Sequence, residues 1–382
     1  MTDSTRADAA HKRQPAVAER NAYVDFLRAF SLLVVVMWHW VFTIIIWKDD
    51  GPHATNPIGF TRGLFFATWL LQIMPLFFYV GGFSHIRSWE RARNRGQSIW
   101  RFVSIRLKTL AIPALVLLGV WVVAGIALGA IFDLHWIGKA VLLVVSPLWF
   151  MAVYLLLILL LPVFLWLHHK FDTIVLVWLV GLAGAIDIIR FRYDHEWIGL
   201  LNMIFVWGFC FQLGFFYDRL HAAPRRADYT LLWAGLFGLS ALVASRLYPG
   251  SMVGVPGERS NMAPPTLCIV ALVLFQAGFA EVIRPWMERR LPRPRWARVN
   301  VVINRFSMPL FLFHTTGMAL SRAVTYAIAG GENEPTRPTG WWWASRPFSV
   351  ILPTVFTLPV IYLFARKWVK PASKPFSAAP AT

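Results

Sequence analysis

Ten separate runs of about twenty mostly apolar residues follow one another along this chain. Each run is long enough to cross the roughly 30 Å hydrocarbon core of a bilayer as a helix. Because lipid offers no hydrogen bonds, a run of this length must pair its backbone groups internally, as a helix does. The sequence therefore predicts an all-α fold, a polytopic membrane bundle of about ten transmembrane helices. The predicted spans are 23–47, 63–86, 109–132, 147–166, 173–190, 196–217, 229–248, 265–283, 305–328 and 347–366.

Composition and the ends of the chain set the domain organisation. Charged residues make up 15% of the chain, against about 25% in soluble domains, which excludes an ordinary soluble fold. We predict one transmembrane domain over residues 21–367, with disordered cytoplasmic tails at 1–20 and 368–382. The least defined stretch is 133–146, because the residue that follows it, Pro147, can either begin a helix or kink one.

The distribution of positive charge along the chain indicates how the chain is oriented in the membrane. The 37 Lys and Arg exceed the 19 Asp and Glu, which gives a formal net charge of +18. When both termini are placed inside, 26 of the 37 basic residues fall on inner segments and 9 on outer ones. Cytoplasmic loops carry such an excess, so we predict cytoplasmic termini. A nucleic-acid site would need basic and aromatic residues interleaved on a soluble face, and a nucleic-acid partner is therefore not expected.

The first predicted span contains three ionisable residues, Asp25, Arg28 and His39. A charged residue costs about 2.5–3.5 kcal/mol to insert, so such residues are functional candidates. On a helix, His39 lies within about 20° of Arg28 and about 16.5 Å further along the axis. Asp25 precedes Arg28 by three residues and can pair with it. A lone arginine often only snorkels, and a lone histidine often only joins two helices, but the alignment of all three favours a functional polar ladder.

Two further groups of polar residues are candidates. His314 lies near the middle of the span at 305–328, where structural and functional interpretations are equally balanced. Arg101, Arg106 and Lys108 lie just before or at the start of the third span and can form a phosphate-binding rim. Basic loops more often only follow the orientation rule or contact anionic lipid.

The two cysteines, Cys210 and Cys268, both fall inside apolar spans, where a thiol packs as a small hydrophobe. No disulfide framework and no metal site is therefore expected.

The polar ladder and its surroundings resemble the acyltransferase 3 family of integral membrane O-acyltransferases. Arg28, ten further residues and His39 match the family's first-helix motif. The segment from Pro75 to Ser84 is similar to a family segment ending in Ser-Gly-Phe, although Gly81 stands where the serine is commonly found. The basic start of span three, the segment Leu148-Trp149-Phe150 and the Leu-Phe-His314 triplet extend the similarity over roughly residues 20–367.

One position departs from the family pattern. The family has two arginines three residues apart at the start of the third helix, whereas here Thr109 follows Arg106 at that spacing, with Lys108 beside it. A lysine holds phosphate as a point charge and lacks the bidentate fork of arginine.

The resemblance implies a plasma-membrane enzyme that moves an acyl group, most often acetyl, from cytoplasmic acyl-CoA to a hydroxyl of a cell-envelope carbohydrate or glycolipid. Acyl-CoA would be a co-substrate, and no bound cofactor is implied. His39 would be the catalytic base or an acyl carrier, with Arg28 and Asp25 beside it. Arg101, Arg106, Lys108, Ser84 and His314 would bind the substrates. The acceptor, the acyl length and a homo-oligomeric state are left open.

A proton-coupled secondary transporter is the competing class. In that case the same intramembrane residues, Asp25, Arg28, His39 and His314, would form a proton or substrate path without covalent chemistry. The sequence lacks paired broken helices in matching halves, a feature of many transporters. Release of CoA from acetyl-CoA separates the two classes.

Overall fold

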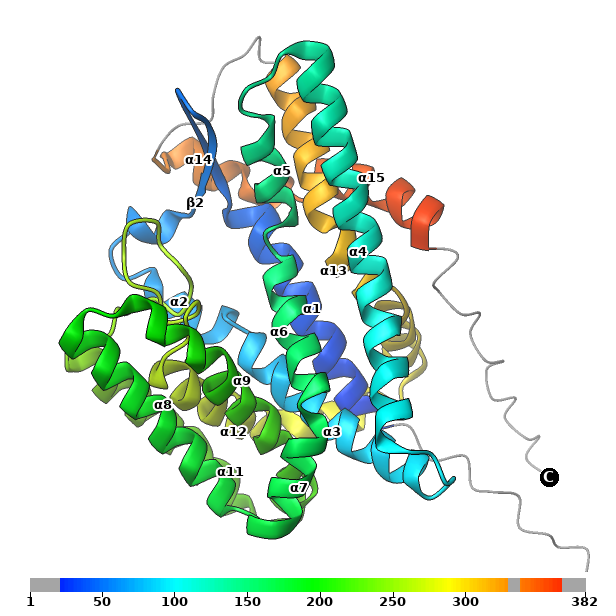
Figure 1. The fold of residues 1–382 in the computed structure, drawn as a ribbon, viewed down its shortest axis with the longest axis vertical. Coiled ribbons are helices and arrows are strands. Elements are labelled where there is room, and N and C mark those ends of the chain that lie inside the picture. Colours follow the sequence, from blue (N-terminus) through cyan, green and yellow to red (C-terminus); the bar gives the residue numbers. More distant parts are fainter. Residues whose placement is uncertain (1–20, 329–336, 366–382) are drawn as a thin grey trace, which may run out of the picture.

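The computed structural model describes residues 21–328 and 337–365, and the predicted tails at 1–20 and 368–382 lie outside this part. Helices dominate it (Figure 1). The α-helices are α1 Ala22–Phe42, α2 Phe65–Leu71, α3 Met74–Arg93, α4 Ile99–Phe132, α5 Ile137–Val145, α6 Leu148–Leu159, α7 Leu161–Phe171, α8 Ile174–Tyr193, α9 Asn202–Leu213, α10 Tyr217–Ala222, α11 Arg225–Ala244, α12 Leu267–Arg290, α13 Pro294–Ile328, α14 Gly340–Ser345 and α15 Ile351–Val360. Shorter helical turns are η1 Pro57–Gly59, η2 Glu196–Leu201, η3 Gly214–Phe216, η4 Arg346–Phe348 and η5 Ile361–Ala365.

The helices confirm the polytopic all-α prediction. Within residues 21–328 and 337–365, eight helical segments are long and apolar enough to cross a membrane, or nine if α5 and α6 form one bent span. The predicted span at 305–328 lies within α13, which is helical but is not among those eight or nine. Its polar side chains His314, Thr315 and Ser321 are buried in the bundle. These polar residues lower the mean hydropathy of the helix, and their burial keeps them inside the bundle.

The first helix is shorter than predicted because its far end turns into a β-hairpin. The Asn21 side chain caps α1 by accepting hydrogen bonds from the backbone of Tyr23 and Val24, both at 3.1 Å. After Phe42 the chain forms β1 (Ile44–Lys48), which pairs antiparallel with β2 (Gly51–Thr55). The predicted helix was therefore wrong over residues 44–47, where three consecutive β-branched isoleucines favour a strand. We call the end of the bundle that carries this hairpin the hairpin end.

The hairpin is fixed to the neighbouring helix α5. Lys139 forms an ion pair with Asp50 in the hairpin turn, and His53 lies 2.8 Å from the same carboxylate. The hydrogen bond from Lys139 holds the pKa of the Asp50 carboxyl below its usual range. The carboxylate therefore stays charged near neutral pH, which keeps the hairpin tied to α5.

A bend separates α5 from α6 at the position where the sequence allowed either a helix start or a kink. The two helices meet at Ser146 and Pro147 with an angle of 45°. Pro147 lacks a backbone N–H and cannot continue the hydrogen-bond ladder of α5. The Ser146 hydroxyl instead donates to the Leu143 carbonyl at 2.8 Å.

Helix α1 lies between α3 and α13, which positions the residues of its polar ladder inside the bundle. Figure 1 shows α8, α9, α11 and α12 grouped at the lower left, α4 and α13 towards the right, and α5 near the top between them and the hairpin. The basic loop between α3 and α4 lies at the opposite end from the hairpin, and we call that end the basic end (Figure 1).

Two glycines set the close approach of α3 to α9 and the following turn. A Cβ atom on Gly82 would overlap the carbonyl oxygen of Phe211, and one on Gly214 would overlap the carbonyl oxygen of Tyr79. Small residues let helix backbones approach in this way. The neighbouring side chains Phe78, Trp207 and Phe211 are fully buried around this crossing.

Candidate functional site

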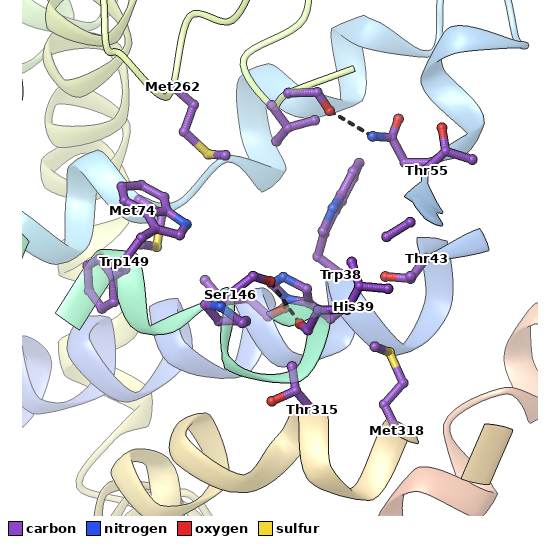
Figure 2. A pocket seen from close by; sticks show the side chains of 18 of the residues that line it. Trp38, His39, Thr43, Thr55, Met74, Ser146, Trp149, Met262, Thr315 and Met318 are labelled. Atoms are coloured by element: carbon purple, nitrogen blue, oxygen red, sulfur yellow. Dashed lines mark hydrogen bonds between the residues drawn. The ribbon is translucent and has the colours of Figure 1, made fainter. Parts of the chain in front are cut away.

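A cavity of about 270 Å³ lies at the hairpin end of the bundle. Its wall combines α1, the hairpin, the bend before α6, the loop between α11 and α12, and α13. Figure 2 shows Trp38 and His39 of α1, and Thr43 directly after it, facing this space together with Trp149, Thr315 and Met318. Aromatic rings and small polar groups therefore share one concave surface, as is usual for small-molecule sites.

His39 lies on the cavity wall with one ring nitrogen free for chemistry. Its Nδ1 lies 2.7 Å from the Val35 carbonyl, the bond drawn in Figure 2. A carbonyl oxygen only accepts, so Nδ1 carries the hydrogen and, in the neutral ring, Nε2 carries a lone pair. His39 is half-buried, while the carbonyl-bonded side of its ring faces its own helix. The side chain is thus held in the tautomer that a base or a nucleophile needs.

His314 of α13 packs directly against His39 but does not line the cavity. The two ring centroids are 4.9 Å apart, with the ring planes inclined by 60°. His314 is fully buried, and its Nδ1 lies 2.5 Å from the Phe311 carbonyl. Trp40 donates to the His314 carbonyl at 3.0 Å, which ties α1 to α13 at this level. The fold therefore brings together two histidines that lie 275 residues apart in the sequence.

The predicted pairing of Asp25 with Arg28 is confirmed. Arg28 Nη2 lies 3.1 Å from Asp25 Oδ1 and 3.1 Å from Asn304 Oδ1 of α13. Asn304 is itself held by its Nδ2 hydrogen bond to Asn300. About one third of the Arg28 side chain remains exposed. Arg28 is thus oriented by two helices and keeps surface available to a ligand.

The three basic residues of α4 do not all lie on one face of that helix. Arg101, Arg106 and Lys108 are all exposed at the basic end. The helical step places Lys108 about 20° from Arg101 and Arg106 about 140° away from it, on another face. The guanidinium of Arg106 lies over the Phe102 ring, 5.0 Å from its centroid. Arg106, rather than the other two, interacts electrostatically with the buried side chains of His85 and Tyr154.

Two buried residues of this inner region, His85 and Tyr154, were not predicted. The Tyr154 hydroxyl lies 3.5 Å from His85 Nδ1, and the same nitrogen lies 2.8 Å from the Gly81 carbonyl. The charges of Arg28 and Arg106 both act on these two side chains. His85 falls inside the predicted span at 63–86, so a search for every intramembrane histidine would have found it. Tyr154 carries no comparable sequence signal.

Gly81 and Tyr154 explain the departure from the family segment. Ser84, the other polar residue of that segment, is half-buried on α3. A Cβ at Gly81 would lie 2.9 Å from the Tyr154 ring and 3.0 Å from its hydroxyl. The ring of Tyr154 therefore occupies the space that a larger residue at position 81 would need.

We expect Gly81→Ser to destabilise the protein by about 1–3 kcal/mol through overpacking against Tyr154. Tyr154→Leu removes the ring that a serine would meet, so the double variant should lose less than the sum of the two single variants. Thermal unfolding of the four proteins in detergent measures this coupling. Strictly additive losses would contradict the packing explanation.

The loop over the cavity is anchored by a buried polar network. Asp187 of α8 accepts hydrogen bonds from Asn202, from Tyr248 and from the backbone of Leu267, at 2.9, 3.1 and 2.9 Å. Tyr248 and Leu267 flank the loop between α11 and α12, so this carboxylate fixes both of its ends. Within the loop, the Gly254 carbonyl accepts from Asn56 at 2.8 Å (Figure 2). Asp187, near the end of the predicted span at 173–190, thus has a structural role.

The fold and site define a polytopic membrane protein with a histidine on a cavity at one end and an arginine on the same helix towards the other. A family model described as an acyltransferase domain matches residues 21–366, nearly the whole chain. The chain therefore belongs to the acyltransferase 3 family and is a membrane acyltransferase. No curated protein and no solved structure matches it.

Proposed function

We propose that the protein transfers an acyl group, most often acetyl, from cytoplasmic acyl-CoA to a hydroxyl of a cell-envelope carbohydrate or glycolipid. The observation that carries this proposal is the position of His39, whose tautomer leaves Nε2 unprotonated on a cavity at the hairpin end. The excess of basic residues on inner segments supports a cytoplasmic basic end and an outward-facing cavity. Such an arrangement suits a plasma-membrane enzyme that joins an inner donor to an outer acceptor.

The donor would bind from the basic end. Coenzyme A carries phosphate groups, which arginine binds through charge-assisted hydrogen bonds. The exposed Arg101, Arg106 and Lys108 would attract those phosphates, while Arg28, with Asp25 fixing its guanidinium, would orient the thioester arm. Ser84 would contact the same arm. This arm would then run along α1 towards His39, about 16.5 Å from Arg28 along the helix axis.

The acceptor would enter the cavity at the hairpin end. The faces of Trp38 and Trp149 suit the apolar side of a sugar ring, and Thr43, Asn56 and Thr315 supply hydrogen-bonding groups around it. His39 Nε2 would accept the proton of the acceptor hydroxyl as the oxygen attacks the thioester carbonyl. The C–S bond then breaks and the thiolate leaves with a proton as free CoA. Alternatively, Nε2 attacks first and carries the acyl group to the acceptor.

The experiment that tests this function is incubation of the purified protein with radiolabelled acetyl-CoA and a carbohydrate extract of the source cell envelope. We expect release of free CoA together with label in an alkali-sensitive ester. A transporter would leave the thioester intact, and that result would reject the proposal. Mass spectrometry of the envelope of a deletion strain should in addition reveal the missing ester and name the acceptor.

A further inference from the structure

The Nε2 atom of His314 is a buried polar atom without a protein partner. Among the described residues none forms a hydrogen bond with it, although the side chain is fully buried. A buried group of this kind is costly unless it interacts with something in a working state of the protein. The ring of His39 is a polar neighbour of this side chain, at 4.9 Å between ring centroids.

Local geometry fixes which part of His314 faces away from its helix. Its Nδ1 is turned back to the Phe311 carbonyl on α13. Nδ1 and Nε2 lie on opposite sides of an imidazole ring, so Nε2 is directed away from that backbone. Helix α1 is one of the two elements that pack most extensively against α13, and its His39 ring contacts the His314 ring. Since Nδ1 carries the hydrogen, Nε2 of His314 carries a lone pair in the neutral ring.

The position of His39 disfavours a positive charge on its ring, because partial burial withdraws that charge from water. In the described part of the chain, no carboxylate is hydrogen-bonded to His39. The lone pair of His314, on the ring that packs against His39, can offset this effect.

We propose that His314 is a positioning residue whose Nε2 lone pair stabilises the cationic form of His39 during acyl transfer. The inference rests on the proposed function, but it holds for either of the two modes of His39. As a base, His39 becomes an imidazolium when the acceptor oxygen bonds to the acyl carbon and loses its proton to Nε2. As an acyl carrier, its ring becomes an acylimidazolium as the C–S bond breaks. As a base, His39 then passes that proton to the departing thiolate. As an acyl carrier, it gives the acyl group to the acceptor oxygen, and the proton of the acceptor hydroxyl goes to the thiolate, so that CoA leaves as the thiol in both cases.

Two substitutions at position 314 separate this role from packing and from substrate binding. His314→Leu fills much of the same volume without a lone pair, whereas His314→Gln presents an amide oxygen that can accept a hydrogen bond near the Nε2 position. We expect the leucine variant to lower kcat by about 10–100-fold, the effect expected for an interaction with a charged group. Glutamine should restore part of that loss. KM for acetyl-CoA should stay unchanged in both, because His314 is fully buried beside His39, away from the basic end where the CoA phosphates would bind.

A matched control comes from Trp40, which donates to the His314 carbonyl and not to its ring. Trp40→Phe should keep kcat within about twofold while removing a comparable contact between α1 and α13. The assay follows CoA release from acetyl-CoA by monodisperse purified protein, with the carbohydrate extract as acceptor. Equal losses in the leucine and glutamine variants, or a raised KM with normal kcat, would overturn the inference. If the wild-type protein itself releases no CoA, the proposed function fails instead.

Discussion

Replacing His39 by alanine is expected to lower acyl transfer by about 10²–10⁴-fold, the contribution typical of a positioned base. The loss follows because the variant has no Nε2 lone pair on the cavity wall. The hydrogen bond that His39 makes lies within its own helix, so its loss leaves no partner on another helix unpaired. The variant should therefore insert and fold normally. CoA release by the purified protein, normalised to monodisperse yield, measures the effect.

The matched control for His39→Ala is His135→Ala. His135 is an exposed histidine between α4 and α5 and is not part of the cavity wall. Its replacement should leave turnover unchanged. Near-normal turnover in purified His39→Ala would reject His39 as the reacting group, whichever of the two modes is considered.

Gly82→Ala is expected to have the largest effect on stability. The added methyl group would overlap the Phe211 carbonyl, a backbone atom that cannot move aside without separating α3 from α9. Overpacking of cores typically costs about 1–3 kcal/mol and sometimes more, and a clash with backbone belongs at the upper end of that range. Thermal unfolding in detergent, together with the yield of monodisperse protein, measures the loss.

Gly181→Ala on α8 provides the comparison for Gly82→Ala. No atom lies within 4 Å of a Cβ placed at Gly181. Because alanine favours helix over glycine by about 0.8–1.0 kcal/mol, this change should be neutral or slightly stabilising. An equal loss in the two alanine variants would show that helix propensity or lipid contact, and not the α3–α9 crossing, determines the result.

The sequence predicted the helices well because apolar runs of spanning length leave the backbone little choice in lipid. It failed at Ile44–Ile46, where hydrophobicity continues but the local β preference and the pairing with residues 53–55 form a hairpin. A hydropathy pattern does not distinguish an apolar strand from the end of an apolar helix. The sequence also left undecided whether a helix starts or bends at Pro147, because a proline is compatible with both.

For the candidate site, the sequence predicted contacts between residues of one helix but not contacts between separate helices. The pairing of Asp25 with Arg28 follows from three residues of helical separation, and it is present. The contacts of His39 with His314 and of His85 with Tyr154 depend on how separate helices meet, which no spacing within a helix encodes. The placement of Arg101, Arg106 and Lys108 depends instead on spacing within one helix. That spacing puts Arg106 on a different face from Arg101 and Lys108.

The bend between α5 and α6 has a consequence for the efficiency of the proposed enzyme. Leu143, Ser146 and Pro147 all line the cavity, so an interrupted stretch of helix faces it. Irregular backbone of this kind is tolerated in membrane proteins where it borders an aqueous space. Water would then have access to His39 whenever the acceptor is absent. Slow wasteful hydrolysis of the acyl donor is therefore the expected background of this architecture, and an acceptor that fills the cavity would suppress it by excluding the competing nucleophile.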